Sequence, residues 1–332
     1  AARRVCASLT RLFDGRAMGR ALAVSLPLFV LYSASGDANW LLANIATISV
    51  AVVVERVGSA PLAALGQGVA IILGFLGLSF ALAWGAAFAI ACAALAAAAV
   101  ALSGLDTRLR TLGNFVFIPV LYLACEVAAT HRAALSLVPY LVVATLPSVA
   151  LAGVDTLRHA ALARRYGTLL RWRGAHLTGH AAAHDELLQA VLAVTLAVAC
   201  SATLVAWRHI EYGQWAIWSS ASVVTGNAAS AHLKLRDRGL GALLGVPLGL
   251  VVGAALPHVL LVHTLATLAS VLTLVGFRHY ATGFAARCAC IACASWAIQQ
   301  SPLVASLRVA EVLAGGAIGV ASVWLVRFLA RN

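Results

Sequence analysis

Long apolar runs recur along the whole chain, separated by short polar stretches, and this pattern limits the folds available to it. About 20 consecutive apolar residues cross the hydrocarbon core of a bilayer as a helix. Hydrophobic residues make up 62% of the 332 residues and charged residues 10%, whereas a soluble domain has about 45–50% and about 25%. Too few polar side chains remain to cover such a chain in water. We therefore expect an all-α integral membrane protein.

The apolar runs predict about twelve transmembrane helices. Their expected ranges are 20–35, 39–54, 61–82, 84–104, 112–130, 135–154, 187–207, 213–230, 239–256, 258–276, 280–298 and 305–328.

The net charge of +12 comes from basic residues that lie mainly at the ends of the apolar runs. With both termini cytoplasmic, nineteen of them fall on the inner side and three (Arg132, Arg208 and Arg308) on the outer side. This bias is typical of membrane orientation, so the charge does not indicate a nucleic-acid partner. It also predicts that the basic segment from Lys234 to Arg238 is a cytoplasmic turn between two helices.

The two halves of the sequence resemble each other. Trp40 and Trp215 each follow a short polar stretch, and the same offset of 175 residues places Gly66 on Gly241 and Gly74 on Gly249. We expect two parallel six-helix repeats, residues 1–155 and 187–332, joined by a basic cytoplasmic amphipathic linker over 156–186. In such duplicated transporters the substrate site tends to lie between the repeats.

Glycine recurs at every fourth position after the basic segment and forms one flat stripe along a helix, made of Gly241, Gly245, Gly249 and Gly253. Small residues let helices approach closely in a membrane. Gly66 and Gly74 form a weaker stripe in the first half. The two stripes could pack against each other, or each could be a packing face against some other helix.

These features together resemble the fusaric acid resistance family, also called the aromatic acid exporter family. Its repeated signature reads here as Gln214-Trp215, an apolar helix to Ala231, the bases of the segment 234–238, and then Gly241 and Gly245. A weaker copy runs from Asn39-Trp40 to Gly74. Many relatives carry a large cytoplasmic domain, where this chain has only about thirty residues between its halves.

The resemblance implies a bacterial inner-membrane protein that exports small aromatic carboxylates or related organic anions, coupled to protons, with a periplasmic adaptor as partner. Assembly into a homo-oligomer is a further expectation. Distant similarity to the plant aluminium-activated malate channels keeps an anion channel as an alternative. A membrane-embedded enzyme and a partner subunit of a larger assembly are further alternatives. We expect no cofactor.

Three charged residues within the predicted spans are candidates for chemistry, because a charge in a membrane is costly. Arg287 could bind a substrate carboxylate through paired hydrogen bonds, pair with an acid, or extend its side chain toward the cytoplasmic surface. Glu126 and Glu311 could exchange protons, the role favoured for Glu126, or either could be the partner of Arg287 or Arg308. Glu311 could instead pair with Arg308, which lies three residues earlier on one helix face, and this pairing is favoured.

Polar residues on two predicted helices complete the candidate substrate site. Asn114 shares a helix with Glu126, and the helix over 213–230 carries Ser222, Thr225 and Asn227. Trp215 would be an interfacial anchor or a stacking surface for a substrate. His176, His180 and His184 are spaced four apart and form a weak candidate metal site; a solvated helix face is favoured for them.

Overall fold

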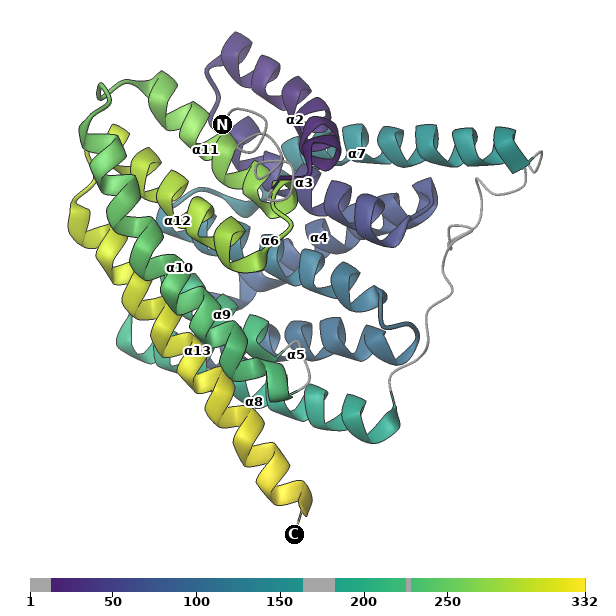
Figure 1. The fold of residues 1–332 in the computed structure, drawn as a ribbon, viewed down its shortest axis with the longest axis vertical. Helices are drawn as coiled ribbons and strands as arrows, with labels where there is room; N and C mark the ends of the chain where they lie inside the picture. The colour runs from purple at the N-terminus through teal and green to yellow at the C-terminus, as the bar shows by residue number, and fades with distance from the viewer. Residues whose placement is uncertain (1–12, 164–182, 225–227, 332) are drawn as a thin grey trace, which may run out of the picture.

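The structure is a computed structural model that describes residues 13–163, 183–224 and 228–331 (Figure 1). Within these ranges the fold is helical, with one isolated β-bridge, between Phe13 and Phe277. The helices are α2 (Gly15–Ser35), α3 (Asn39–Val57), α4 (Pro61–Ala81), α5 (Gly85–Ala101), the 3-10 turn η1 (Leu102–Gly104), α6 (Leu109–Ala129), α7 (Ala134–Ala163), α8 (His184–Arg208), α9 (Gln214–Val224), α10 (Ala228–Ala254), α11 (Leu260–Gly276), α12 (Tyr280–Ala297) and α13 (Pro302–Arg331).

Many of these helices are apolar enough for a bilayer. Among the described residues, nine segments are long and apolar enough to cross a membrane by length and composition; they lie in α2 to α8, α10 and α13. Helix α11 is also apolar but has 17 residues. The all-helical fold agrees with the predicted class, a multi-pass membrane protein in contact with lipid. The number of crossings and the two-repeat plan stay predictions.

The first described helices begin and end at residues suited to those positions. Asp14 Oδ1 accepts a hydrogen bond from the Ala17 backbone N–H (3.1 Å) at the start of α2, as a helix-capping residue does. Gly36 and Gly58 follow α2 and α3 with φ values of 70° and 73°, a left-handed conformation that costs glycine little. Helix α4 begins at Pro61, whose missing N–H is no loss there.

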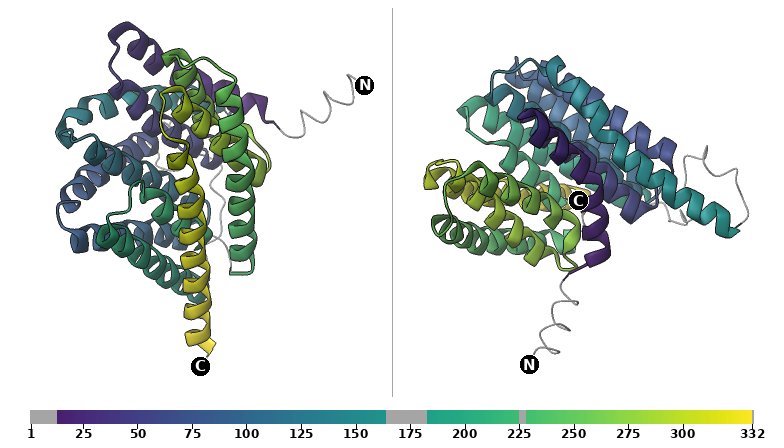
Figure 2. Two further views of the ribbon diagram at one scale, coloured as in Figure 1. Left: turned by 90° about the vertical axis from the view of Figure 1, so that its left-hand side faces the viewer. Right: turned by 90° about the horizontal axis from the view of Figure 1, so that it is seen from above.

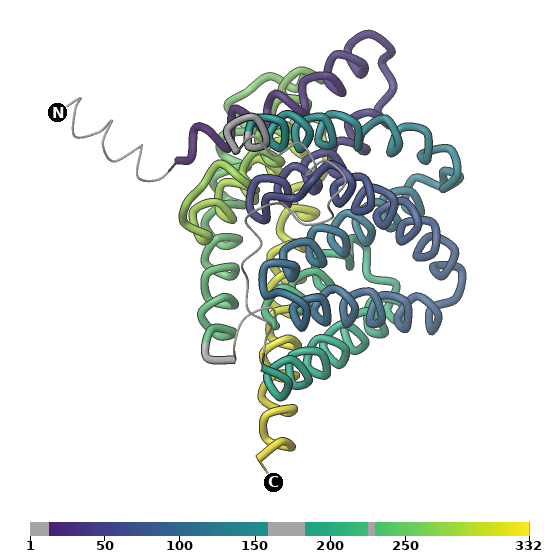
Figure 3. Tube along the Cα trace, turned by 90° about the vertical axis from the view of Figure 1, so that its right-hand side faces the viewer, coloured from purple at the N-terminus to yellow at the C-terminus, as the bar shows by residue number. Residues whose placement is uncertain are grey.

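The bundle has two groups of helices that meet along α8 and α9. Helices α10, α12 and α13 pack together on one side, with α11 against α12, while α3, α4, α6 and α7 pack on the other. Helix α9 packs on α13 and α8, and α8 packs on α5. Figures 2 and 3 show the last turns of α13 extending beyond the neighbouring helices. In the group that contains α3 and α7, the Arg20 guanidinium of α2 joins these two helices through Glu55 (2.6 Å) and Asp155 (3.0 Å).

The glycine stripe of α10 faces α12. A Cβ added at Gly245 would lie 2.2 Å from the Ala285 carbonyl oxygen, and one at Gly249 would lie 2.1 Å from the Ala289 oxygen. Gly74 of α4 instead faces Val120 of α6. The idea that the two stripes pack against each other is therefore wrong, because each stripe is filled by a helix of its own half. Each stripe contacts another helix, as the second interpretation states.

At the two ends of the α10 stripe the nearest atoms of α12 belong to side chains. A Cβ at Gly241 would lie 2.8 Å from Phe284 Cδ1, and one at Gly253 would lie 3.0 Å from the Cβ of Trp296. Gly253 therefore belongs to the packing face that the sequence predicts, but its approach to α12 is the loosest of the four. In the weaker stripe, Gly66 is a half-buried residue of α4. The close approach of α10 to α12 thus centres on Gly245 and Gly249.

A second glycine stripe, which the sequence analysis did not single out, brings α13 onto α9. A Cβ at Gly315 would lie 2.0 Å from the Ala216 carbonyl oxygen, and one at Gly319 would lie 2.7 Å from the Ser220 oxygen. This contact fixes the distance between the helices that carry Trp215 and Arg308.

The basic segment from Lys234 to Arg238 is helical and lies within α10, so the prediction of a turn is wrong. The reason lies in the surroundings of its last residue. Arg238 is only 1% exposed, because its side chain extends into the bundle and contacts aromatic rings instead of water. The side chain of Arg236, in contrast, is 65% exposed, as expected for a solvated charge.

The predicted linker begins and ends inside helices. Helix α7 continues to Ala163, and α8 starts at His184, so the limits expected near residues 155 and 187 fall within these two helices. Most of the predicted amphipathic segment, residues 164–182, lies outside the described residues.

A pH-dependent contact joins the α2–α3 loop to α7. The Tyr140 hydroxyl donates to the Asp37 carboxylate, and this bond, followed by that of the Asn39 backbone N–H, lowers the pKa of Asp37 below its ordinary value of 3.8. Since the native pKa is lowered, the contact stabilises the fold above about pH 4 and is lost as the pH falls through the native pKa. We expect Tyr140→Phe to lower the thermal midpoint in detergent at pH 6 and to have a smaller effect at the lowest pH at which the protein stays folded. An equal loss at both pH values would contradict this assignment.

Candidate functional site

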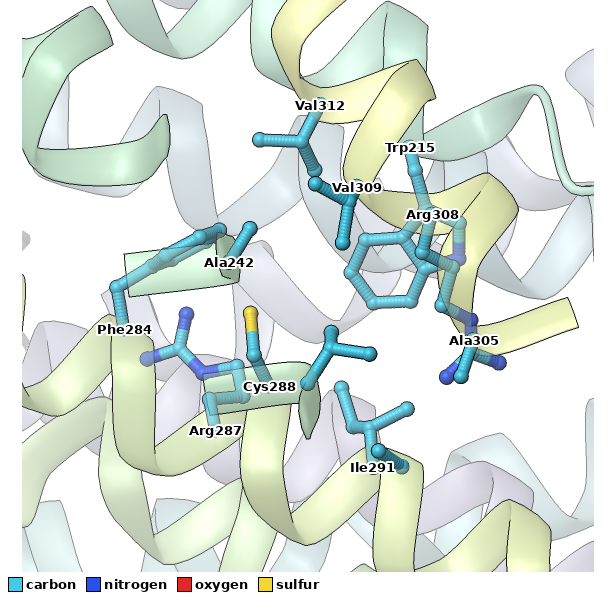
Figure 4. Close-up of a pocket in the computed structure, with 12 residues that line it drawn as sticks. Trp215, Ala242, Phe284, Arg287, Cys288, Ile291, Ala305, Arg308, Val309 and Val312 are labelled. Carbon is cyan, nitrogen blue, oxygen red and sulfur yellow. The ribbon is translucent and has the colours of Figure 1, made fainter. Parts of the chain in front are cut away.

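Helices α9, α10, α12 and α13 enclose a pocket (Figure 4). Most of its wall is apolar or aromatic, and its charged members are Arg287 and Arg308. The lining residues are Trp215, Ala242, Val246, Phe284, Arg287, Cys288, Ile291, Ala292, Ala305, Arg308, Val309 and Val312. All of them belong to the second half of the chain, so this pocket lies within that half, whereas the sequence placed the substrate site between the halves.

Arg287 enters the pocket from the second turn of α12, beside Phe284 and Cys288 (Figure 4). Its Nε donates to the Thr273 hydroxyl of α11 (3.1 Å). Within the described residues no carboxylate lies within 4.0 Å of this guanidinium. The alternative that Arg287 pairs with an acid is therefore not what the structure shows, and its charge faces an apolar cavity.

Arg308 enters from α13 on the other side of the pocket, next to Trp215 (Figure 4). Its guanidinium lies over the rings of Trp215 (5.2 Å to the centroid) and Tyr212 (5.7 Å), contacts of the cation–π type. Its Nε and Nη1 are buried and have no hydrogen-bond partner within the described part of the chain. The N–H groups of these two nitrogens are thus left for a ligand.

The expected ion pair of Arg308 with Glu311 does not form. No carboxylate oxygen of the described residues lies within 4.0 Å of the Arg308 nitrogens, whose guanidinium lies over the aromatic rings of α9 and its preceding loop. Glu311 is buried, 7% exposed, and its Oε2 lacks a hydrogen-bond partner among the described residues. The two charges still lie within electrostatic range of each other.

Glu126 lies on α6, outside the pocket lining. Its carboxylate is within electrostatic range of Arg308, and the Tyr122 hydroxyl is within hydrogen-bonding reach of it. The structure therefore brings Glu126 toward Arg308 and not toward Arg287. Arg308 thus lines the pocket and is also within electrostatic range of two carboxylates, Glu126 and Glu311.

The remaining predicted site residues fall in different places. Trp215 is buried, lines the pocket, stacks on Trp218 (5.3 Å between centroids) and has no partner for its Nε1 among the described residues. Asn114 and Ser222 are half-buried and do not line the pocket, and the Ser222 hydroxyl donates to the Ser219 carbonyl (3.1 Å). Thr225 and Asn227 lie outside the described residues.

The weak candidate metal site has one member in the described residues. His184 is the exposed first residue of α8, and His176 and His180 lie outside the described ranges. In the part of the chain that the structure describes, no group of three or more His, Cys, Asp or Glu side chains could hold a metal ion.

Arg238 is a buried cation, although its place in the basic segment predicts an exposed turn. Its Nε donates to the Ser219 hydroxyl (3.3 Å) and its Nη1 to the Tyr280 hydroxyl (2.9 Å). The ring of Phe284 lies under the guanidinium (4.5 Å). Because Phe284 also lines the pocket, Arg238 lies directly behind the pocket wall. Arg238 precedes Ala242 and Val246 by four and eight residues, so the three residues share one helix face. This spacing is the sequence signal that could have indicated that Arg238 faces the same side as the pocket lining.

The site is that of a multi-pass membrane protein with a cationic, aromatic-lined pocket. Residues 196–322 match the family model described as fusaric acid resistance protein-like, and all four pocket helices fall in this range except for the end of α13. The match confirms the predicted resemblance: this part of the chain is similar to the fusaric acid resistance family. No match was found among curated proteins or among solved structures.

Proposed function

We propose that the protein exports small organic anions, aromatic carboxylates foremost, across the bacterial inner membrane. The family match and the apolar helices indicate a membrane transport or resistance protein. The observation that carries the finer proposal is the pocket itself, in which two guanidinium groups face an apolar, aromatic cavity. A carboxylate can accept paired hydrogen bonds from an arginine, while the rest of an aromatic substrate contacts Trp215, Phe284 and the aliphatic wall.

Proton coupling is proposed from the neighbours of Arg308. The guanidinium can interact with a substrate carboxylate in the pocket or with the nearby carboxylates of Glu126 and Glu311. Protonation of the two carboxylates leaves Arg308 for the substrate, and their ionisation draws Arg308 away and weakens substrate binding. Tyr122 and Tyr212 also lie within electrostatic range of Arg308. This competition would link anion release to proton exchange.

The two-repeat plan is supported by matching helix contacts in the two halves. The pairs α2·α3, α3·α7, α4·α6, α4·α7 and α5·α6 in the first half correspond in order to α8·α9, α9·α13, α10·α12, α10·α13 and α11·α12 in the second, and all ten pairs are in contact. The two halves also contact each other through corresponding pairs: α5 packs on α8, and its counterpart α11 packs on α2. Such an arrangement suits rocking of one half against the other.

A test uses inside-out vesicles, radiolabelled benzoate and an acid interior. Passive permeation of the protonated acid moves it toward the alkaline side, opposite to the proposed transport. We expect gradient-dependent uptake, and at least a tenfold lower kcat/KM for Arg287→Gln, because a charge-assisted hydrogen bond contributes about 1.5–3 kcal/mol. Arg278→Gln is the matched control, since Arg278 is an exposed base just before α12. Uptake no higher than in empty vesicles, or equal loss in both variants, would refute the proposal for this substrate class.

An anion channel is a second candidate function, favoured by one observation. Arg238 adds a third buried guanidinium to those of Arg287 and Arg308, so several intramembrane bases are available to a permeating anion. A channel would give anion currents in a planar bilayer and no accumulation against a gradient. The periplasmic adaptor, the homo-oligomer and the cytoplasmic position of both termini stay predictions.

A further inference from the structure

The guanidinium of Arg238 has no charged partner among the residues that the structure describes. Its contacts with Ser219 and Tyr280 are to hydroxyl groups and that with Phe284 is to an aromatic ring, and its Nη2 has no hydrogen-bond partner among the described residues. No carboxylate of the described part of the chain lies within 4.0 Å of it. A buried charge is costly unless it is paired. A bound anion at Nη2 would supply the missing countercharge.

One face of α10 connects this group to the pocket. Lys234, Arg238, Ala242 and Val246 follow one another at four-residue spacing and so lie on the same side of the helix, and Ala242 and Val246 line the pocket. With a rise of about 1.5 Å per residue, Arg238 lies about 6 Å along the helix from the pocket lining, and Lys234 about 6 Å further. The glycine stripe occupies a different side, against α12.

Further bases lie at both ends of this face. Lys234 is within electrostatic range of Arg110 of α6 as well as of Arg238. Arg110 reaches the end of α9, where its Nη2 donates to the Val224 carbonyl (3.2 Å). In the pocket, Cys288 is within electrostatic range of three guanidinium groups: Arg287, Arg238 and Arg308. Positive charge thus continues from the start of α6 and α10 to the pocket.

We infer that Arg238 forms a second anion-binding position, between the pocket and the end of the bundle that holds Lys234 and Arg110. An anion would pass from one position to the other past the ring of Phe284, which contacts Arg238 and also lines the pocket. The inference deepens the proposed function and rests on it, because it requires that the protein carries an organic anion. It adds a residue and a route that the pocket alone does not contain.

Arg238→Met tests the inference because a binding role and a structural role predict opposite changes in stability. Methionine fills similar space and removes the buried charge, so the thermal midpoint in buffer without organic anion should stay unchanged or rise. The KM for benzoate in inside-out vesicles should increase at least tenfold, and Arg238→Lys, which keeps the charge, should give an intermediate KM. Arg236→Met is the matched control: it removes an exposed base two residues away and should change neither quantity.

The possible outcomes separate this inference from the proposed function. If Arg238→Met lowers the thermal midpoint or fails to fold, Arg238 is a structural residue and the inference is wrong. If the variant folds and keeps the wild-type KM while the wild type transports benzoate, the inference fails and the proposed function stands. If the wild type does not transport benzoate, the proposed function fails for this substrate and the inference fails with it.

Discussion

Replacement of Gly249 by alanine is expected to destabilise the protein by about 1–3 kcal/mol, the usual cost of overpacking. The new Cβ would lie 2.1 Å from the Ala289 carbonyl oxygen and 2.7 Å from its Cα. These are backbone atoms of α12, so no side-chain rotation can relieve the clash, and the two helices must separate. Gly245 makes the same close approach to Ala285 one turn away. The measurement is the thermal midpoint of the purified protein in detergent, which should fall by several degrees.

Gly77→Ala is the matched control for this prediction. Gly77 lies inside α4, and a Cβ there would meet nothing within 4 Å. Alanine is favoured over glycine within a helix by about 1 kcal/mol, so this variant should be as stable as the wild type or more stable. Equal thermal midpoints for the two alanine variants would mean that α12 does not depend on the glycine stripe for its position.

Neutralising both carboxylates near Arg308 is expected to separate binding from proton coupling. In the Glu126→Gln, Glu311→Gln double variant, Arg308 no longer has a charged competitor for the substrate. We expect benzoate to bind about tenfold more tightly at pH 7.5, the effect of removing about 1.4 kcal/mol of competing interaction. Gradient-driven accumulation should disappear, while exchange of internal for external benzoate continues. Equilibrium dialysis and vesicle uptake measure the two effects.

Two further variants define what would contradict this result. Arg308→Gln should lose both binding and exchange, since it removes the donor itself. Glu211→Gln removes an exposed carboxylate of the α8–α9 loop and should behave as the wild type. A double variant that still accumulates benzoate in response to the pH gradient would show that protons are coupled elsewhere or not at all.

The positions of the helices could be predicted from the sequence because a segment that crosses the lipid needs a long run of apolar residues. Each predicted range overlaps a helix of the structure. The ends of the helices over 39–57 and 61–81 were also marked by local signals, Gly58 and Pro61. The partner of each glycine stripe was not predictable, because a stripe of small residues shows that a helix can be approached closely but carries no information on which helix approaches.

The basic segment of α10 shows where a rule based on charge fails. Three bases within five residues are typical of a solvated turn, and Arg236 behaves that way. Arg238 does not, because Tyr280 and Phe284 of α12 and Ser219 of α9 surround it. These residues are distant in sequence, so burial of the charge depends on packing that local composition does not determine.

The candidate site also has a part that could be predicted from the sequence and a part that could not. Arg287 and Trp215 could be selected as single unusual residues, and the structure brings both to one pocket. The relation of Glu126 to Arg308 could not be predicted, since α6 and α13 are far apart in the chain and many pairings of two acids with the available arginines were open. The expected pair of Arg308 with Glu311 was a local inference, and the rings of Tyr212 and Trp215 offered the guanidinium another surface.

Cys288 lies in the pocket wall next to Arg287 (Figure 4). A thiol at this point is a chemical reporter that the chain already contains. An alkylating reagent small enough to enter the pocket adds atoms where a bound anion would lie, so the reagent and the anion exclude each other. The rate of alkylation then measures the fraction of time for which the pocket is both empty and open. Substrates could thus be ranked by how far each one slows the modification, read by mass spectrometry on the unaltered protein.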